Sequence, residues 1–161
     1  MLHIEQDDPA RLDVRTLLNE HLADMSATSP AESVQALDHA ALSGPEITFW
    51  TAREDGALLG CGALKRLSKN QAEVKSMRTT PAARGRGIAA LLLNQIVDQA
   101  RRLNYELLSL ETGSQEFFAP ARRLYRRHGF HDCPPFASYS LDPNSAFMQL
   151  SLVSGTPELS L

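Results

Sequence analysis

Residues 78–93 read RTTPAARGRGIAALLL, a turn of glycines and arginines that leads directly into an apolar run. The run predicts a helix, because Ile88, Leu92 and Ile96 recur every four residues. A helix normally begins with Ser, Thr, Asp or Asn, whose side-chain oxygen accepts the N–H groups of the first turn. No such residue stands here. The free N–H groups, the helix dipole and the glycines together favour a bound anion such as pyrophosphate.

The turn has other interpretations. A flexible surface turn with solvated arginines needs no ligand, and a Walker loop, GxxxxGK followed by Ser or Thr, is absent from the sequence. The dinucleotide fingerprint GxGxxA is matched by Gly85, Gly87 and Ala90, and Glu111 stands where a ribose-binding acid belongs. However, Pro81 interrupts the preceding strand and only one parallel crossover follows, so NAD(P) binding is the weaker interpretation.

Three β-rich or apolar runs precede the turn. They are ITFWTAR (47–53), ALLGCGALKRL (57–67) and QAEVKSMRT (71–79), separated by Glu-Asp-Gly and Ser-Lys-Asn. This pattern predicts an antiparallel meander of three strands. YELLSLETG (105–113) follows the helix as a buried strand, so we expect a strand, helix, strand unit with parallel pairing and a right-handed crossover.

Helices are expected before and after this central part. Residues 10–25 carry leucines at helical spacing, and Ser29 and Pro30 introduce a second short helix. Its apolar residues are Val34, Leu37 and Leu42. Pro120 and Gly129 frame a later helix, APARRLYRRHGF.

The sequence ends with AFMQLSLV, a last strand candidate, and a polar stretch. With 161 residues the chain fits one domain. We expect that domain to cover residues 1–153, with a loose tail at 154–161.

Composition excludes several classes of protein. No apolar run approaches the roughly 18 residues of a membrane span, and the N-terminus does not resemble a signal peptide, which predicts a cytoplasmic protein without membrane contact. A net charge of −3 argues against nucleic-acid binding. Cys61 and Cys133 lie far apart, and the five histidines lack ligand spacing, so neither a disulfide framework nor a metal site is expected.

The acyl-CoA signature of one family, Gln or Arg, two residues, Gly, one residue, then Gly or Ala, is filled by Arg84, Gly87 and Ala89. Together with the order of elements and the stretch RLYRRHGF (123–130), these residues resemble the GNAT superfamily of N-acetyltransferases. The resemblance implies an α/β (α+β) fold. In this fold a mixed, mostly antiparallel central sheet is flanked by helices, and a splayed parallel strand pair holds acyl-CoA.

The resemblance also implies a site for acetyl-CoA as co-substrate. Amides from Arg84 to Ala89 would cradle the pyrophosphate, and the backbone of Met77 and Thr79 would pair with pantetheine like an added strand. The expected cofactor-binding residues are Met77, Arg78, Thr79, Arg84, Gly85, Arg86, Gly87, Ile88 and Ala89. Many relatives carry Asn seven residues before the helix tyrosine, where this chain has Phe118.

Acetyl transfer to an amine needs a base, an oxyanion donor and an acid for the departing thiolate. Glu73 lies 11 residues before Arg84, where several GNAT relatives hold their base, and we expect it to act through water. Its structural alternative is a surface carboxylate paired with Lys75. Glu111 is the alternative base, and a turn or cap acceptor is its structural alternative. A histidine is a further candidate.

Tyr125 is the expected acid. Its reference pKa of about 10 keeps it protonated, and donation to a thiolate of pKa about 8.5 costs about 2 kcal/mol. Its structural alternative is a core tyrosine. By resemblance, the Met77 N–H would be the oxyanion donor. Trp50 lines the acceptor pocket or belongs to the core, and the loop from Ser26 to Ser33 is a candidate lid.

These residues predict an acyl-CoA-dependent N-acetyltransferase that moves acetyl directly to a primary amine of a small molecule or peptide. The alternatives are a non-catalytic acyl-CoA-binding module and an NAD(P)-dependent oxidoreductase. A homodimer is a further possibility, because the last strands offer a sheet edge. The sequence leaves the acceptor amine open.

Overall fold

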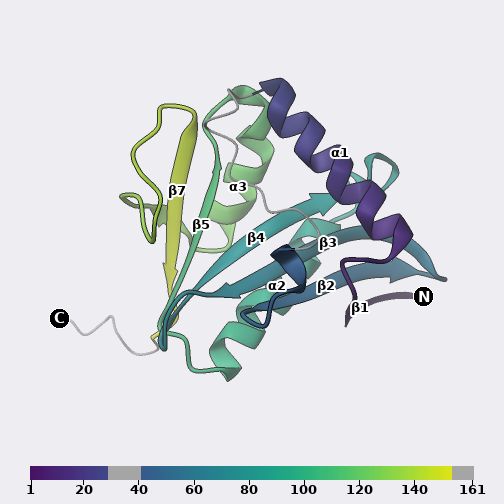
Figure 1. Ribbon diagram of the computed structural model, residues 1–161, viewed down its shortest axis with the longest axis horizontal. Helices are drawn as coiled ribbons and strands as arrows, with labels where there is room; N and C mark the ends of the chain where they lie inside the picture. The colour runs from purple at the N-terminus through teal and green to yellow at the C-terminus, as the bar shows by residue number, and fades with distance from the viewer. Residues whose placement is uncertain (29–40, 154–161) are drawn as a thin grey trace.

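The computed structural model describes residues 1–28 and 41–153 (Figure 1). The expected second helix lies largely outside these residues, as do most of the expected lid and the tail at 154–161. The strands are β1 (Leu2–Gln6), β2 (Ile47–Glu54), β3 (Ala57–Arg66), β4 (Gln71–Thr79), β5 (Leu107–Gly113), β6 (His131–Asp132) and β7 (Ser145–Ser151). The helices are α1 (Leu12–Thr28), α2 (Ile88–Arg102) and α3 (Ala119–Arg127), with 3-10 turns at Ala41–Ser43, Pro81–Ala83 and Glu116–Phe118.

The strands form one seven-stranded sheet in the order β1-β2-β3-β4-β5-β7-β6. Only β4 and β5 pair in parallel, and every other neighbouring pair is antiparallel. The predicted meander, crossover and final strand are confirmed. Two short edge strands, β1 and β6, were not predicted, because five and two residues carry too little alternation to be recognised.

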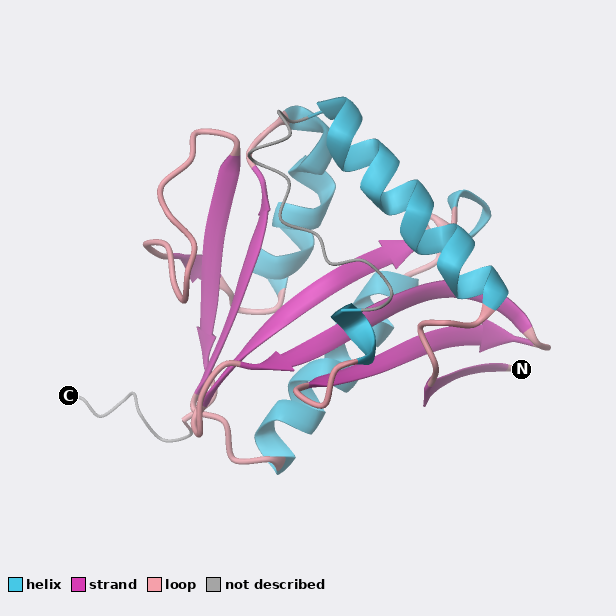
Figure 2. Ribbon diagram, viewed as in Figure 1, coloured by secondary structure: helices cyan, strands magenta, loops and turns pink. Residues whose placement is uncertain are grey.

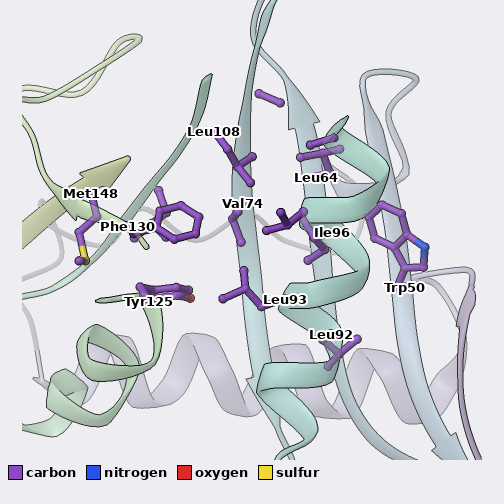
Figure 3. Packing of buried hydrophobic residues seen from close by; sticks show 14 of the residues in the cluster. Trp50, Leu64, Val74, Leu92, Leu93, Ile96, Leu108, Tyr125, Phe130 and Met148 are labelled. Atoms are coloured by element: carbon purple, nitrogen blue, oxygen red, sulfur yellow. The ribbon is translucent and has the colours of Figure 1, made fainter. Parts of the chain in front are cut away.

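Helices cover both faces of the sheet (Figure 2). α2 and α3 lie on one face, and their side chains meet Val74, Leu108 and Met148 in the larger hydrophobic cluster (Figure 3). α1 lies on the other face, where Val14 and Leu18 pack against residues of β2 and β3. No helix among the described residues is long and apolar enough to span a bilayer.

The parallel pairing of β4 and β5 is short. It joins Gln71–Val74 to Leu107–Leu110 and then stops, while β4 continues beside β3 and β5 continues beside β7. A β-bulge bends β4 just beyond this point, where the register against β3 shifts and Ser76 takes a φ of 56°. The two strands therefore diverge in the middle of the sheet, as the resemblance implied.

A buried arginine fixes the start of α1 to the sheet. Arg53 is 3% exposed and bonds two carboxylates, Asp7 before α1 at 3.2 Å and Asp13 in its first turn at 2.8 Å. Thr51 donates a further hydrogen bond of 2.7 Å to Asp7. Because Arg53 and Asp7 lie almost wholly out of water, each depends on the other, whereas Asp13 is half exposed.

Replacing Arg53 with Gln should therefore remove the buried cation of Asp7 and leave Arg11, whose side chain is 48% exposed, as its ion-pair partner. We expect the free energy of unfolding to fall by about 3 kcal/mol. Urea denaturation followed by circular dichroism measures the change. Arg66→Gln, which removes an exposed arginine at the end of β3, is the matched control and should stay within about 0.5 kcal/mol of the parent.

Candidate active site

A pocket of about 600 Å³ lies beside the part of β4 that is no longer paired with β5. It brings together residues from β4, the glycine turn, α2, α3 and α1. Of the predicted site residues it contains Met77, Arg78, Thr79, Arg84, Gly85, Gly87, Ile88, Ala89 and Tyr125. The side chain of Arg86 turns away instead and bonds Glu54 at 2.9 Å. A volume of this size accommodates an organic ligand.

The glycine turn presents bare backbone to this pocket. Gly87 is the N-cap of α2 with a φ of 78°, and no side chain caps the helix. Within the described residues, the N–H groups of Ile88 and Ala89 have no hydrogen-bond partner. Gly85 also has a positive φ, 82°, a conformation that side chains rarely adopt. The helix start therefore retains free donors for an anion.

Two amides of the predicted cradle are already used. Arg84 N–H donates to the carbonyl of Pro81 at 3.4 Å, and Arg86 N–H donates to that of Ala83 at 3.3 Å. These bonds build the turn itself. The available donors are therefore fewer than the six amides from Arg84 to Ala89.

One wall of the pocket is apolar. It consists of Phe117, Phe118, Pro120, Ala121 and Leu124 from the start of α3 and the turn before it. Phe118, which replaces the expected Asn, packs over Gly113 so closely that a Cβ there would meet its ring at 2.0 Å. An apolar wall suits a hydrocarbon segment of a ligand, and Phe118 offers no amide to hydrogen-bond it.

Tyr125 lies at the inner end of the pocket. It is 6% exposed, belongs to the larger hydrophobic cluster and packs edge-on against Phe130 (Figure 3). Burial raises the pKa of its hydroxyl well above the usual range, and the nearby charge of Glu111 raises it further. The residue is therefore both a core tyrosine and a pocket tyrosine, and it holds its proton at neutral pH.

Glu73 lies on the α1 face of the sheet. It is 2% exposed, its carboxylate lies 3.1 Å from the Lys75 ammonium, and the Tyr139 hydroxyl donates to it at 2.6 Å. The predicted pairing with Lys75 is thus present, but as a buried pair and not on the surface. Tyr139 lies far along the chain, between β6 and β7, and no local pattern marked it.

Glu111 occupies the point of divergence. It is the first residue of β5 beyond the last pair with β4, and alternation places it on the same face as Ser109 and Glu73. Burial raises the pKa of its carboxyl to about 7 against a hydrogen bond from Ser145 and the Lys75 charge, which lower it. Glu111 is therefore poised to exchange a proton near neutral pH.

The structure adds His21 of α1, which sequence reasoning did not single out. It lines the pocket beside Arg78, and its pKa is lowered to about 4, mainly by burial and then by the Arg78 charge. Arg78 in turn pairs with Asp24, also on α1, at 2.5 Å. Only the fold brings α1 over β4, so no local signal identified His21, Arg78 and Asp24 as neighbours.

Trp50 does not reach the pocket. It is 2% exposed and packs beneath α2 with Leu64 and Ile96 (Figure 3). Of the two roles predicted for Trp50, the structure shows that of a core residue. Among the described residues, no group of His, Cys, Asp and Glu side chains could hold a metal ion.

Comparison with known proteins places this geometry in a family. The model of the Acetyltransferase (GNAT) family matches residues 14–130. YsnE of Bacillus subtilis, an uncharacterized N-acetyltransferase, is 50% identical over 94% of this chain and all of its own length. YedL of Escherichia coli, another uncharacterized N-acetyltransferase, is 45% identical over 94% of this chain and 96% of its own. A crystal structure of a proposed acyl-CoA N-acyltransferase from Klebsiella pneumoniae superposes with a TM-score of 0.77 at 26% identity, covering 95% of this chain and 99% of that one.

The lowered pKa of His21 predicts a pH-dependent stability. Between pH 6.5 and 4 the unfolded chain binds a proton at His21 that the folded protein does not, so acidification costs roughly 2 to 3 kcal/mol. Glu111, whose pKa is raised, contributes with the opposite sign, but equally in the parent and in a variant that lacks His21. The difference in pH dependence between these two proteins therefore isolates the contribution of His21.

We expect His21→Gln to lose this contribution when unfolding by urea is measured from pH 7 to pH 4.5. His131→Gln, which replaces an exposed histidine, should keep the parental pH dependence. A His21→Gln curve parallel to that of the parent would contradict the assignment.

Proposed function

The chain belongs to the Acetyltransferase (GNAT) family, and on this basis we propose that it transfers acetyl from acetyl-CoA directly to a primary amine of a small molecule or peptide. The observation that carries the proposal is the helix start at Gly87, which has no capping side chain and lines the pocket beside the unpaired end of β4. A diphosphate matches its free donors and its positive dipole.

The pocket offers a separate surface to each part of the donor. The N–H groups of Gly87, Ile88 and Ala89 would bind the pyrophosphate. The edge of β4 from Met77 to Thr79 lies beyond its pairing with β5, so its main chain would receive the pantetheine amides. The apolar wall that includes Phe118 and Leu124 would contact the carbon chain.

Bound acetyl-CoA supplies an acetyl group on a thioester. We assign Glu111 as the base that takes the proton of the amine, directly or through water, because a pKa of about 7 lets it be deprotonated and still basic near neutral pH. Glu73, the base expected from the resemblance, is held by Lys75 and Tyr139. Its role in this assignment is to position those two side chains beside Glu111.

Tyr125, which lines the pocket, is the assigned acid. Its raised pKa makes donation to a thiolate costlier than for an ordinary tyrosine. The charge of Glu111 is one of the two causes of that rise. Once Glu111 has accepted a proton it is neutral, so Tyr125 becomes a stronger acid at the stage when the thiolate must be protonated.

Turnover can be measured as free thiol released from acetyl-CoA in the presence of a panel of primary amines. We expect Tyr125→Phe to lower kcat about 100-fold or more and to leave the dissociation constant for CoA, measured by calorimetry, within about twofold. Tyr105→Phe, a partly buried tyrosine outside the pocket, is the matched control. CoA binding without transfer to any amine would instead indicate a binding module, and NAD(H) binding without CoA binding an oxidoreductase.

The assignment of Glu111 predicts a pH profile. Because the deprotonated form is the active one, kcat/KM should fall about tenfold per pH unit below pH 7 and level off above it. Glu111→Gln should lower the plateau and abolish this limb, whereas Glu106→Gln, at an exposed position just before β5, should retain both. If Glu111→Gln keeps the limb while Glu73→Gln loses it, the base is Glu73.

A further inference from the structure

The backbone and the side chain of Arg78 lie on different sides of the sheet edge. Its backbone lies on the edge of β4 at the pocket, while its side chain turns to the other face of the sheet, toward α1. The register explains this direction, because Arg78 is opposite Cys61, which packs in the cluster beneath α1. The contacts proposed for acetyl-CoA involve only the main chain of Arg78, so they give its guanidinium no role.

The guanidinium is only partly used by the protein. Its side chain is 10% exposed and Nη1 pairs with Asp24 at 2.5 Å. Nε is buried and has no hydrogen-bond partner. A buried donor without an acceptor is costly, and a charged one more so. Because Arg78 is one of the residues that line the pocket, a hydrogen-bond acceptor supplied by a ligand is the simplest explanation for this N–H group.

The surroundings of Arg78 favour an anion as that acceptor. Asp24 orients the guanidinium by holding one end, so the Nε edge is fixed in place. His21 is the neighbouring pocket residue, and its lowered pKa means that it is neutral and can donate or accept one hydrogen bond. The Lys75 ammonium, in contrast, is already matched by Glu73. Both cations have a carboxylate partner, but among the described residues Arg78 keeps a buried donor, Nε, that nothing accepts from.

The position of Arg78 relative to Glu111 limits the size of the ligand. The last β4–β5 pair is Val74 with Leu110, so Lys75 and Glu111 are the first residues of the two strands beyond their pairing, and the Lys75 charge acts on the Glu111 carboxyl. Lys75 and Arg78 lie opposite Ala63 and Cys61, which are two residues, or roughly 7 Å, apart along β3. A small molecule can bridge this spacing with one hydrogen bond of about 2.9 Å at each end.

We infer that Arg78 binds a carboxylate of the acceptor, so that the acceptor is an amino acid or a close derivative with its amine near a free carboxylate. The amine faces Glu111, and the carboxylate accepts from Nε of Arg78. This inference rests on the proposed acetyl transfer and specifies its substrate class. An internal lysine of a peptide, or a simple amine, lacks the anion that Arg78 requires at this distance.

The test compares acceptors that differ only in this group. The proteinogenic amino acids are screened first with acetyl-CoA, and the best substrate is then compared with its carboxamide and with its decarboxylated amine. We expect the amino acid to exceed both analogues about 10- to 100-fold in kcat/KM, since a charge-assisted bond to a buried guanidinium is lost in each analogue. Most of the difference should lie in KM.

Variants of the same site give the second arm. Arg78→Gln should abolish the preference for the carboxylate, so that the amino acid and the decarboxylated amine have similar kcat/KM values in this variant. Arg78→Lys, which keeps the charge, should restore part of the preference. Arg102→Gln, an exposed arginine at the end of α2, should behave as the parent. Thermal unfolding and CoA calorimetry on each variant report whether the fold and the donor site are intact.

Two outcomes separate this inference from the proposed function. If the parent acetylates amino acids, carboxamides and amines equally well, the carboxylate assignment is overturned while acetyl transfer stands. If no amine of any kind is acetylated although CoA binds, the proposed function itself fails. Equal loss of all three substrates in Arg78→Gln, with CoA affinity retained, would make Arg78 a structural partner of Asp24 and would also overturn the inference.

Discussion

The early end of the parallel pairing between β4 and β5 is the constraint on which the site depends. Four residues of each strand are paired, and beyond Val74 and Leu110 each strand keeps only its outer neighbour. A sheet broken in this way exposes main-chain donors and acceptors in the middle of a domain, where they would otherwise be bonded. The β-bulge at Ser76 bends β4 away at this point, and the pocket and the position of Glu111 follow from the divergence.

The sheet also separates two kinds of chemistry. Backbone donors and apolar side chains dominate the face of α2 and α3, where Gly87 and Phe118 line the pocket. Buried ionic side chains dominate the face of α1, where Glu73, Lys75 and Arg78 are held by partners from distant parts of the chain. Tyr125 lines the pocket and Glu111 is the first residue of β5 beyond its pairing with β4, and the charge of Glu111 raises the pKa of Tyr125.

Local patterns were sufficient to predict most of the fold. The uncapped start of α2, the meander and the final strand depend on neighbours in sequence, so periodicity and turn residues revealed them. The buried ionic side chains on the α1 face depend on contacts such as that between Glu73 and Tyr139, 66 residues apart. Contacts of this kind leave no trace in a local pattern. The same limitation applies to His21, to the inward packing of Trp50 and to the outward turn of Arg86.

A donor held by main-chain amides and an acceptor held by side chains differ in how they respond to mutation. Almost any exchange at an exposed position of the glycine turn keeps its N–H groups, provided that Gly85 and Gly87 retain their positive φ. A single exchange at Arg78 or His21, by contrast, alters the charge and shape of the pocket lining, which in the proposed function would receive the amine. Duplicated genes built on this plan can therefore diverge toward new amines while sharing one acyl donor.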